Sequence, residues 1–399
     1  ILVNLMGLRA WLSFPKKTPA LIWISIGAFP YIFGIVHLHI HDEIQKEQQL
    51  IAKNDPYRAL LVQTAFPAEE AIIFNDKASY ISFVIDEWTQ IYKILHNYCE
   101  KTVDLIALPE YVVPFGTYTF LYPHENVKNS IIKIFGKSAE EKLPPLEEPF
   151  AHSYQTKQGD VWFVNNAFWA QTIANIFHSE VIVGLEDVDV DQNQNNKRKH
   201  YSAAIHFMPN ATKEKFVFQR YAKRVLLPMA EYIPFSFFES IASLYGIQSS
   251  LTFGSEATVF SKNTMPFGVS ICYEETFGNL MRECRLNGAE LFVNLTSDVW
   301  YPNSNLPKQH FDHARLRSVE NGIPIVRACN TGITSACDSL GRIVAMLGDN
   351  TPESQWIADA LYVEVPKYHY RTLYSKFGDL PILLLCTLGL FGGFVWPKQ

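Results

Sequence analysis

The most constraining feature of the sequence is a long uncharged stretch near its start. Residues 18–40 (TPALIWISIGAFPYIFGIVHLHI) are 23 positions without a formal charge, close to the roughly 20 residues that a helix needs to cross a bilayer. Gly27 and Pro30 are expected to kink this helix, which membrane helices tolerate when neighbouring helices satisfy the freed backbone groups. The stretch predicts a transmembrane helix, with a buried core helix as the alternative.

A second uncharged stretch, residues 380–396, has 17 positions and lies at the short edge of the spanning range. Basic residues precede the first stretch, whereas histidines and acids follow it, which favours a cytoplasmic N-terminal side. We expect residues 1–41 to end an N-terminal transmembrane region, residues 42–379 to form an extracytoplasmic domain, and residues 380–399 to form a C-terminal transmembrane helix. Because the sequence begins at Ile1, inside an apolar stretch, we also expect it to be a fragment.

Charge and cysteine content exclude several classes of protein. A formal charge of −6 and scattered basic residues leave no surface suited to nucleic acid. The six cysteines are too sparse for a disulfide scaffold and show no CxxC pair, so we expect neither a structural zinc site nor another bound metal. We expect no cofactor either.

Between the two uncharged stretches, short β-branched runs alternate with amphipathic segments. The runs begin at residues 59, 103, 180, 201, 267, 290, 324, 342 and 360. This alternation predicts an α/β fold, and nine strands suit two packed sheets. Residues 78–99 carry an apolar stripe from Ile81 to Cys99 at three- and four-residue steps and are predicted to form a helix packed on the core.

Two segments of this region are expected to lie outside regular structure. Residues 187–200 (DVDVDQNQNNKRKH) are polar and lack periodicity, so they predict an exposed loop between two strands. Residues 235–263 are rich in Phe and Ser and predict a long loop of the kind that covers active sites.

Three residues stand out as candidates for chemistry. Cys272 ends the apolar run FGVSIC, Glu110 ends VDLIALPE, and Lys223 lies between Tyr221 and an apolar Leu-Leu-Pro segment. A cysteine where a strand gives way to a helix is expected to have a lowered thiol pKa. Taken singly, each has an ordinary reading: a buried cysteine, a solvated glutamate and a surface lysine.

In chain order, the motifs LPE, YxK with PxxEYIP, and ICYEE resemble the nitrilase (carbon-nitrogen hydrolase) superfamily, and within it the membrane-bound branch of apolipoprotein N-acyltransferases. NLTSDVWY at 294, HARLRSVENGIPIVRACNTGIT at 313 and FGDLP at 377 support that branch. Ser297, Tyr301 and the pair Met229-Ala230 depart from its usual pattern. The resemblance implies an α-β-β-α sandwich with flanking transmembrane helices.

The resemblance also implies a ping-pong mechanism. Cys272 is the expected nucleophile, Glu110 the general base and Lys223 the oxyanion stabiliser. Glu231, Tyr273 and Glu274 match positions that bind substrate or support the site, although Tyr273 and Glu274 are equally well explained as helix caps. The acyl donor would be a membrane phospholipid and the acceptor an apolipoprotein, with the domain on the periplasmic side of a bacterial inner membrane and the chain crossing it more than once.

Two other functions remain open at this stage. A membrane-tethered nitrilase-like hydrolase would use the same three residues and discharge the acyl group to water. A catalytically inactive domain serving as an interaction module is the third possibility, and the intact Glu110, Lys223 and Cys272 argue against it.

Overall fold

A computed structural model of the chain describes residues 2–52, 56–68, 72, 74, 76–157, 159–191, 197–210, 219–234, 251–260, 265–301, 304–349 and 351–395. The chain divides into two compact units, Ile1–Pro56 and Tyr57–Gln399. The predicted loop at 235–263 lies largely outside the described residues; of it, residues 251–260 are described, and Val259–Phe260 form strand β9.

The first unit consists of two helices, α1 (Leu2–Leu12) and α2 (Lys17–Ala52). Within the described part of the chain, Lys17–Glu47 is the one helical segment long and apolar enough to cross a membrane. The expected span at residues 18–40 lies inside α2. The expected domain boundary after residue 41 also falls within this helix, which continues to Ala52.

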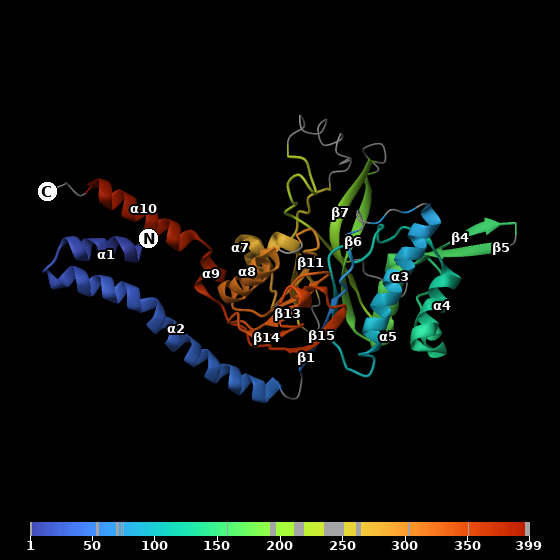
Figure 1. The fold of residues 1–399 in the computed structure, drawn as a ribbon, viewed down its shortest axis with the longest axis horizontal. Coiled ribbons are helices and arrows are strands. Elements are labelled where there is room, and N and C mark those ends of the chain that lie inside the picture. Colours follow the sequence, from blue (N-terminus) through green and yellow to red (C-terminus); the bar gives the residue numbers. More distant parts are fainter. Residues whose placement is uncertain are drawn as a thin grey trace. The chain divides into compact units, whose positions relative to one another are not determined.

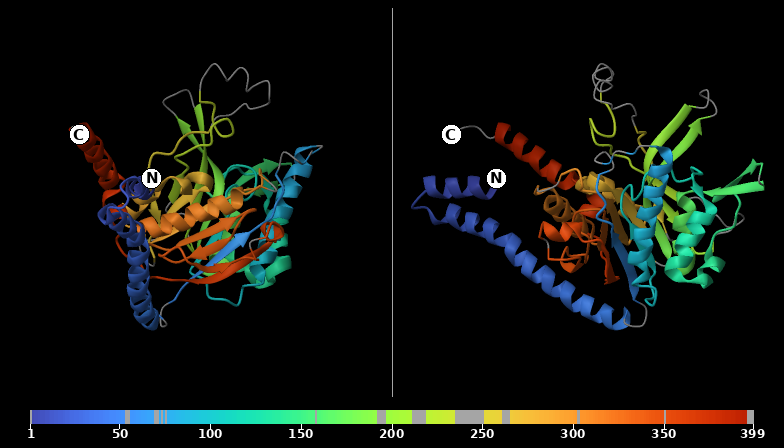
Figure 2. Two further views of the ribbon diagram at one scale, coloured as in Figure 1. Left: turned by 60° about the vertical axis from the view of Figure 1, so that its left-hand side comes forward. Right: turned by 45° about the vertical axis from the view of Figure 1, so that its right-hand side comes forward.

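The second unit is built on two six-stranded sheets (Figure 1, Figure 2). The first has the order β15-β1-β2-β6-β7-β8 and the second the order β14-β13-β12-β11-β10-β9. The bounds of the first are β1 (Tyr57–Gln63), β2 (Leu105–Leu108), β6 (Glu180–Asp191), β7 (Lys197–Phe207), β8 (Gln219–Ala222) and β15 (Asp359–Val365). Those of the second are β9 (Val259–Phe260), β10 (Phe267–Ile271), β11 (Leu291–Thr296), β12 (Ile325–Cys329), β13 (Ser335–Cys337) and β14 (Ile343–Met346). All nine predicted runs are strands.

Several helices and a small third sheet complete this unit. The helices are α3 (Lys77–His96), α4 (His124–Phe135), α5 (Asn166–Phe177), α7 (Gly278–Leu286), α8 (Leu306–Asn321) and α9 (Leu373–Phe377). Strands β3 (Tyr122–Pro123), β4 (Ala151–Thr156) and β5 (Gly159–Val164) form the third sheet. The second expected span corresponds to helix α10 (Leu380–Val395), whose apolar side chains from Leu380 to Leu388 are exposed where described.

One core cluster lies between the two large sheets and another lies between the first sheet and helices α3 and α5, because side chains alternate across each strand. Ala59 and Leu61 of β1 face the second sheet, where they join Val293 and Leu295 of β11. The intervening Leu60 and Val62 instead join a cluster with α3 and α5. On the outer face of the second sheet, Phe292 packs with residues of α7 and α8. This layering confirms the predicted α-β-β-α sandwich.

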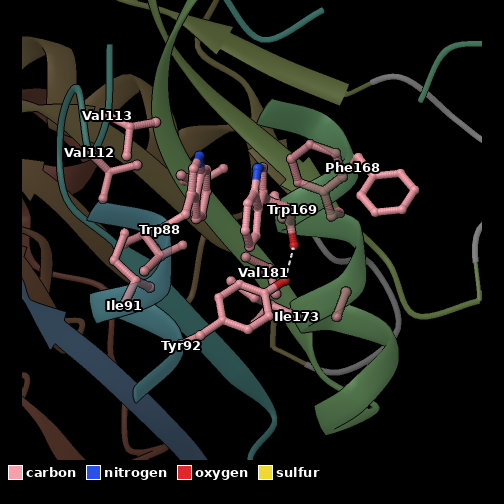
Figure 3. Packing of buried hydrophobic residues seen from close by; sticks show 14 of the residues in the cluster. Trp88, Ile91, Tyr92, Val112, Val113, Phe168, Trp169, Ile173 and Val181 are labelled. Atoms are coloured by element: carbon pink, nitrogen blue, oxygen red, sulfur yellow. Dashed lines mark hydrogen bonds between the residues drawn. The ribbon is translucent and has the colours of Figure 1, made fainter. Parts of the chain in front are cut away.

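Helix α3 packs on the first sheet much as its apolar stripe predicted. Asp76 caps it, accepting a hydrogen bond from the Ser79 amide at 2.7 Å. Trp88 stacks on Trp169 of α5 with ring centroids 5.7 Å apart, and the Tyr92 hydroxyl donates to the Trp169 carbonyl at 2.8 Å (Figure 3). Such aromatic pairs contribute about 0.5–1.5 kcal/mol beyond their buried area. The assignment of Cys99 to this stripe was wrong, because the helix ends at His96 and Cys99 is exposed.

The predicted loop at 187–200 is mostly strand, which corrects the sequence interpretation. Strand β6 continues to Asp191 and β7 begins at Lys197. The two pair in antiparallel register through Asp189↔Lys199 and Asp191↔Lys197, so acids on one strand lie opposite bases on the other. Opposite charges across a ladder stabilise an antiparallel pair. This charge pairing extends the hairpin. The sequence interpretation missed it because the segment has few hydrophobic residues.

Candidate active site

Cys272 lies where β10 gives way to the 3-10 helix η3 (Cys272–Thr276). Its φ of 54° is in the left-handed region, which costs a residue with a Cβ about 1–2 kcal/mol. Strain of this kind, when it is held by the surrounding structure, is common at functional positions. Asn294 on the neighbouring β11 helps to hold it, because its Nδ2 donates to the Cys272 carbonyl and to Ser270 Oγ, each at 3.0 Å.

Lys223 lies directly after β8 and is buried, with 1% of its surface exposed. Its ammonium donates to Glu110 Oε1 at 2.9 Å and to Glu231 Oε1 at 2.7 Å. The residue's backbone is also fixed, since its amide donates to the Ser202 carbonyl at 2.8 Å. One buried cation therefore bridges two carboxylates.

Glu110 follows β2 and Pro109, and it is 6% exposed. The neighbouring strand β6 sets its backbone position: the Gly184 amide donates to the Pro109 carbonyl at 3.1 Å, and the Val112 amide donates to the Gly184 carbonyl at 3.0 Å. A Cβ at Gly184 would lie 2.5 Å from the Glu110 Cα. Only glycine therefore leaves room for the glutamate at this point.

Electrostatic coupling joins Cys272 to this pair. Burial raises the pKa of the Cys272 thiol well above its usual value, Glu110 raises it further, and Lys223 opposes both. Burial likewise raises the pKa of the Glu110 carboxyl, against the effect of Lys223. Burial disfavours the Lys223 ammonium, but Glu110, Cys272 and Glu231 together hold its pKa well above the usual lysine value.

The expected lowering of the cysteine pKa by a helix dipole was therefore wrong for the unliganded site. Helix η3 is only five residues long, and the dipole effect depends on aligned peptide units over a longer helix. Desolvation of the thiol outweighs it. Burial therefore favours the protonated thiol, which lies within hydrogen-bonding reach of the Glu110 carboxyl.

The three further candidates all support Lys223 and its loop. Glu231 accepts from Lys223 and, through its other oxygen, from the Leu227 amide at 2.7 Å. The Tyr273 hydroxyl donates to the Leu226 carbonyl at 2.8 Å, and its ring lies 5.8 Å from the Lys223 ammonium.

Glu274 is more than a cap. Its Oε2 accepts from the Ile271 amide at 2.9 Å, which is the capping contact, and from the Tyr221 hydroxyl at 2.8 Å. The other oxygen accepts from the amides of Arg224 and Val225 at 2.6 and 2.9 Å. One buried carboxylate thus ties the segment that carries Lys223 to the turn that carries Cys272.

Two buried charge pairs near the site escaped the sequence analysis. Glu275 of η3 forms two hydrogen bonds with the Arg327 guanidinium, at 2.8 and 3.1 Å, and both side chains are fully buried. Asp298 Oδ1 accepts a hydrogen bond from His310 Nδ1 at 2.9 Å. A charged residue inside an apolar strand, such as Arg327 in PIVRACNTG, was the available signal, because buried charges occur only when they are paired.

Within the described residues, no group of three or more His, Cys, Asp or Glu side chains is arranged to hold a metal ion. The hydrogen-bonded groups around Cys272 instead suit nucleophilic chemistry at a carbonyl carbon: a thiol, a carboxylate to receive its proton, and a fixed cation.

Comparison with known proteins identifies the family of the chain. The sequence pattern of the carbon-nitrogen hydrolase family matches residues 84–367. The chain belongs to this family.

Two relatives from the genus Chlamydia, both named apolipoprotein N-acyltransferase, match nearly the whole chain. The protein from Chlamydia pneumoniae is 32% identical over 387 residues, covering 95% of this chain and 64% of the relative. The one from Chlamydia muridarum is 31% identical, covering 99% and 67%. The chain thus spans about two thirds of the length of these relatives. Among solved structures, a nitrilase-superfamily protein from Saccharomyces cerevisiae has a TM-score of 0.47 at 16% identity, covering 82% of this chain and 94% of that one.

Proposed function

We propose that this chain transfers a fatty acyl group from a membrane phospholipid to the N-terminal α-amino group of an apolipoprotein, through a thioester on Cys272. The observation that carries the proposal is the buried Lys223 ammonium, bound to Glu110 and Glu231 and coupled to the Cys272 thiol. The acceptor class comes from the name that relatives at 31–32% identity carry. Residue chemistry supports acyl transfer but does not choose the acceptor.

In the first half-reaction, the Cys272 sulfur attacks the ester carbonyl carbon of the phospholipid while Glu110 accepts the thiol proton. Lys223 stabilises the negative charge on the carbonyl oxygen; loss of one such donor typically costs about a hundredfold or more. The tetrahedral intermediate collapses, the carbon–oxygen bond breaks, and the departing lysophospholipid alkoxide takes the proton from Glu110.

The second half-reaction uses the same groups, with the proton finally returned from Glu110 to Cys272. The acceptor amine attacks the thioester carbonyl, and Glu110 accepts a proton from its nitrogen. Collapse breaks the carbon–sulfur bond, and the Cys272 sulfur recovers its proton from Glu110. A single carboxylate therefore serves as base and acid in turn.

Exposed apolar side chains near the candidate residues support a lipid substrate. Met229 follows Lys223 by six positions and is 48% exposed, and Phe277 follows Cys272 by five and is 40% exposed. Trp300, beyond β11, is 54% exposed. Large exposed apolar side chains that follow the candidate residues closely in sequence suit contact with acyl chains.

The proposed location is a bacterial inner membrane, with the catalytic domain on the extracytoplasmic side. Lys16 and Lys17 precede the apolar part of α2, whereas Asp42 and Glu43 follow it, as expected for a cytoplasmic N-terminal end. Helix α10 would provide a second crossing, so the chain would be multi-pass. Confinement to the bilayer surface raises the local concentration of two lipid-anchored substrates.

Intact-mass analysis of the chain in lipid nanodiscs tests this proposal. After incubation with phospholipid, the wild-type chain should gain one acyl group that hydroxylamine removes. Cys272→Ala should gain none, whereas the matched control Cys99→Ala, at an exposed cysteine, should behave as wild type. An adduct on Cys272→Ala, or none on either wild type or control, contradicts the assignment.

A diacylated lipopeptide then separates transfer from hydrolysis. For an acyltransferase, the lipopeptide should discharge the adduct and itself gain the acyl mass as an amide. If the adduct decays to free fatty acid at the same rate with and without lipopeptide, the chain is a hydrolase instead.

A further inference from the structure

A small basic pocket lies at the junction between helices α7 and α9, outside the candidate active site. It is lined by Arg285 and Leu286 at the end of α7, and by Arg371, Ser375 and Lys376 in and before α9. Three of its five lining residues are cationic and none is acidic. The composition is that of an anion site.

Backbone contacts hold the pocket in shape. Arg285 donates to the Ala289 carbonyl at 2.8 Å and to the Tyr370 carbonyl at 3.3 Å. One turn earlier on α7, Arg282 donates to the carbonyls of Tyr374 and Lys376 at 3.1 and 2.6 Å. Two guanidinium groups therefore clamp the segment 370–376 onto α7, and the geometry of the pocket does not depend on a ligand.

In the described structure, the protein neutralises the charge of the pocket only in part, and without a direct ion pair to its three cations. Across the described part of the chain, none of Arg285, Arg371 and Lys376 has a carboxylate within ion-pairing distance. Burial lowers the pKa of Arg285, the nearby Arg371 lowers it further, and Glu290 offsets this only in part. A half-buried guanidinium beside a second cation favours binding of an anion between them.

The surroundings of the pocket indicate which anion. Leu286 is 56% exposed, Leu373 75% and Phe377 53%. Only three residues separate Lys376 from the first residue of α10. Cations at the level of phosphate groups, with apolar side chains reaching into the acyl region, are the pattern of a surface that lies on an anionic membrane.

We propose that this basic pocket binds the phosphodiester headgroup of an anionic phospholipid at the base of α10. Arg371 and Lys376 contact the phosphate oxygens from the exposed side, and Arg285 does so from the half-buried side. Leu373 and Phe377 lie against the acyl chains of the same lipid. The site is separate from Cys272, so it orients the domain on the membrane and does not supply the acyl group.

Native mass spectrometry of the full chain in detergent measures this binding directly. The Cys272→Ala background removes acyl transfer, so the result is independent of the proposed reaction. The probes are dioctanoyl phosphatidylglycerol, dioctanoyl phosphatidylcholine and inorganic phosphate. We expect one tightly held phosphatidylglycerol and at least about tenfold weaker retention in Arg371→Gln/Lys376→Gln, because two charge-assisted contacts are lost.

The matched control is Lys133→Gln, which removes an exposed cation from α4 and should leave retention unchanged. The single variant Arg371→Gln, at an exposed position, replaces the double variant if the latter has a lowered unfolding temperature. Equal retention by wild type and the pocket variant overturns the proposal. So does inorganic phosphate or phosphatidylcholine binding as tightly as phosphatidylglycerol, because the pocket would then not select an anionic lipid.

Discussion

At the scale of single residues, the site places one cation between two carboxylates in a buried position. Lys223 is bound to Glu110 and Glu231 at 2.9 and 2.7 Å, so both of its carboxylate partners hold the ammonium in place. A buried ion pair is weak evidence for stability, but removing one partner leaves an uncompensated charge. The second carboxylate therefore fixes the ammonium in the position that the proposed mechanism requires for stabilising an oxyanion.

Glu231→Gln tests that role. The amide keeps the shape and one acceptor oxygen but loses a charge-assisted hydrogen bond of about 1.5–3 kcal/mol. We expect the acylation rate to fall about 10- to 100-fold, with little change in the phospholipid concentration that gives half the maximal rate. Stopped-time intact-mass measurements of acyl-enzyme formation give both quantities, and an unchanged rate would remove Glu231 from the site.

The pH dependence of acylation follows from Glu110. Its pKa is raised, chiefly by burial, and Glu231 contributes further to the rise. Glu110 acts as a base only when ionised, so activity should be lost as the pH falls through a range above that of an exposed glutamate, about 4.3. In Glu231→Gln this acid limb should move to lower pH, because a neighbouring negative charge is removed. A limb that stays in place or moves upward contradicts the coupling.

At the scale of secondary-structure elements, adjacent strands set the backbone on which the site depends. Strand β6 contributes no side chain to the chemistry, yet Gly184 lies directly against Pro109 and Glu110. Similarly, strand β12 supports η3, because Arg327 of β12 forms an ion pair with Glu275 of η3. Replacing one partner of such a buried pair typically costs about 3–5 kcal/mol.

Gly184→Ala should displace Glu110 and also lower the unfolding temperature, with a larger effect on the acylation rate. The new Cβ would lie 2.4 Å from the Pro109 carbonyl oxygen and 2.5 Å from the Glu110 Cα, and backbone atoms cannot move aside as a flexible side chain can. A shift of about 1 Å at a catalytic group can cost about a hundredfold in rate. Acylation measured beside the unfolding temperature separates the two effects: loss of both in proportion would indicate general unfolding instead.

At the scale of the whole molecule, the apolar helices α2 and α10 do not contribute to the buried hydrophobic core where they are described. Apart from Ala10, every buried hydrophobic residue in the described part of the chain lies between Tyr57 and Tyr368. Where their side chains are described, the apolar residues of α2 and α10 are mostly exposed, and exposing such surface to water costs roughly 25 cal/mol per Å². The helices therefore need a membrane or another partner, whereas the sandwich is complete without them.

Residues 57–378 alone should consequently fold. We expect a cooperative thermal transition by circular dichroism and acylation of Cys272 by a water-soluble short-chain ester at a rate near that of the full chain. Acylation from phospholipid vesicles should fall at least about tenfold, because the domain is no longer held at the surface. Failure of the isolated domain to unfold cooperatively would show that the helices belong to its core.

The sequence by itself determined the elements that depend on local pattern. Short β-branched runs located nine strands, and helical periodicity located α3. The ends of apolar runs located Glu110 and Cys272 at strand ends, since a side chain at a strand end is placed by the strand itself. Only the tertiary structure decided the rest. Lys223 and Glu110 are 113 positions apart in the sequence but are hydrogen-bonded in the fold. The charged residues at the end of β6 and the start of β7 form strands because the two segments pair with each other. The Cys272 thiol is desolvated by the residues that the fold places around it. These properties depend on distance in space, which periodicity along a chain does not encode.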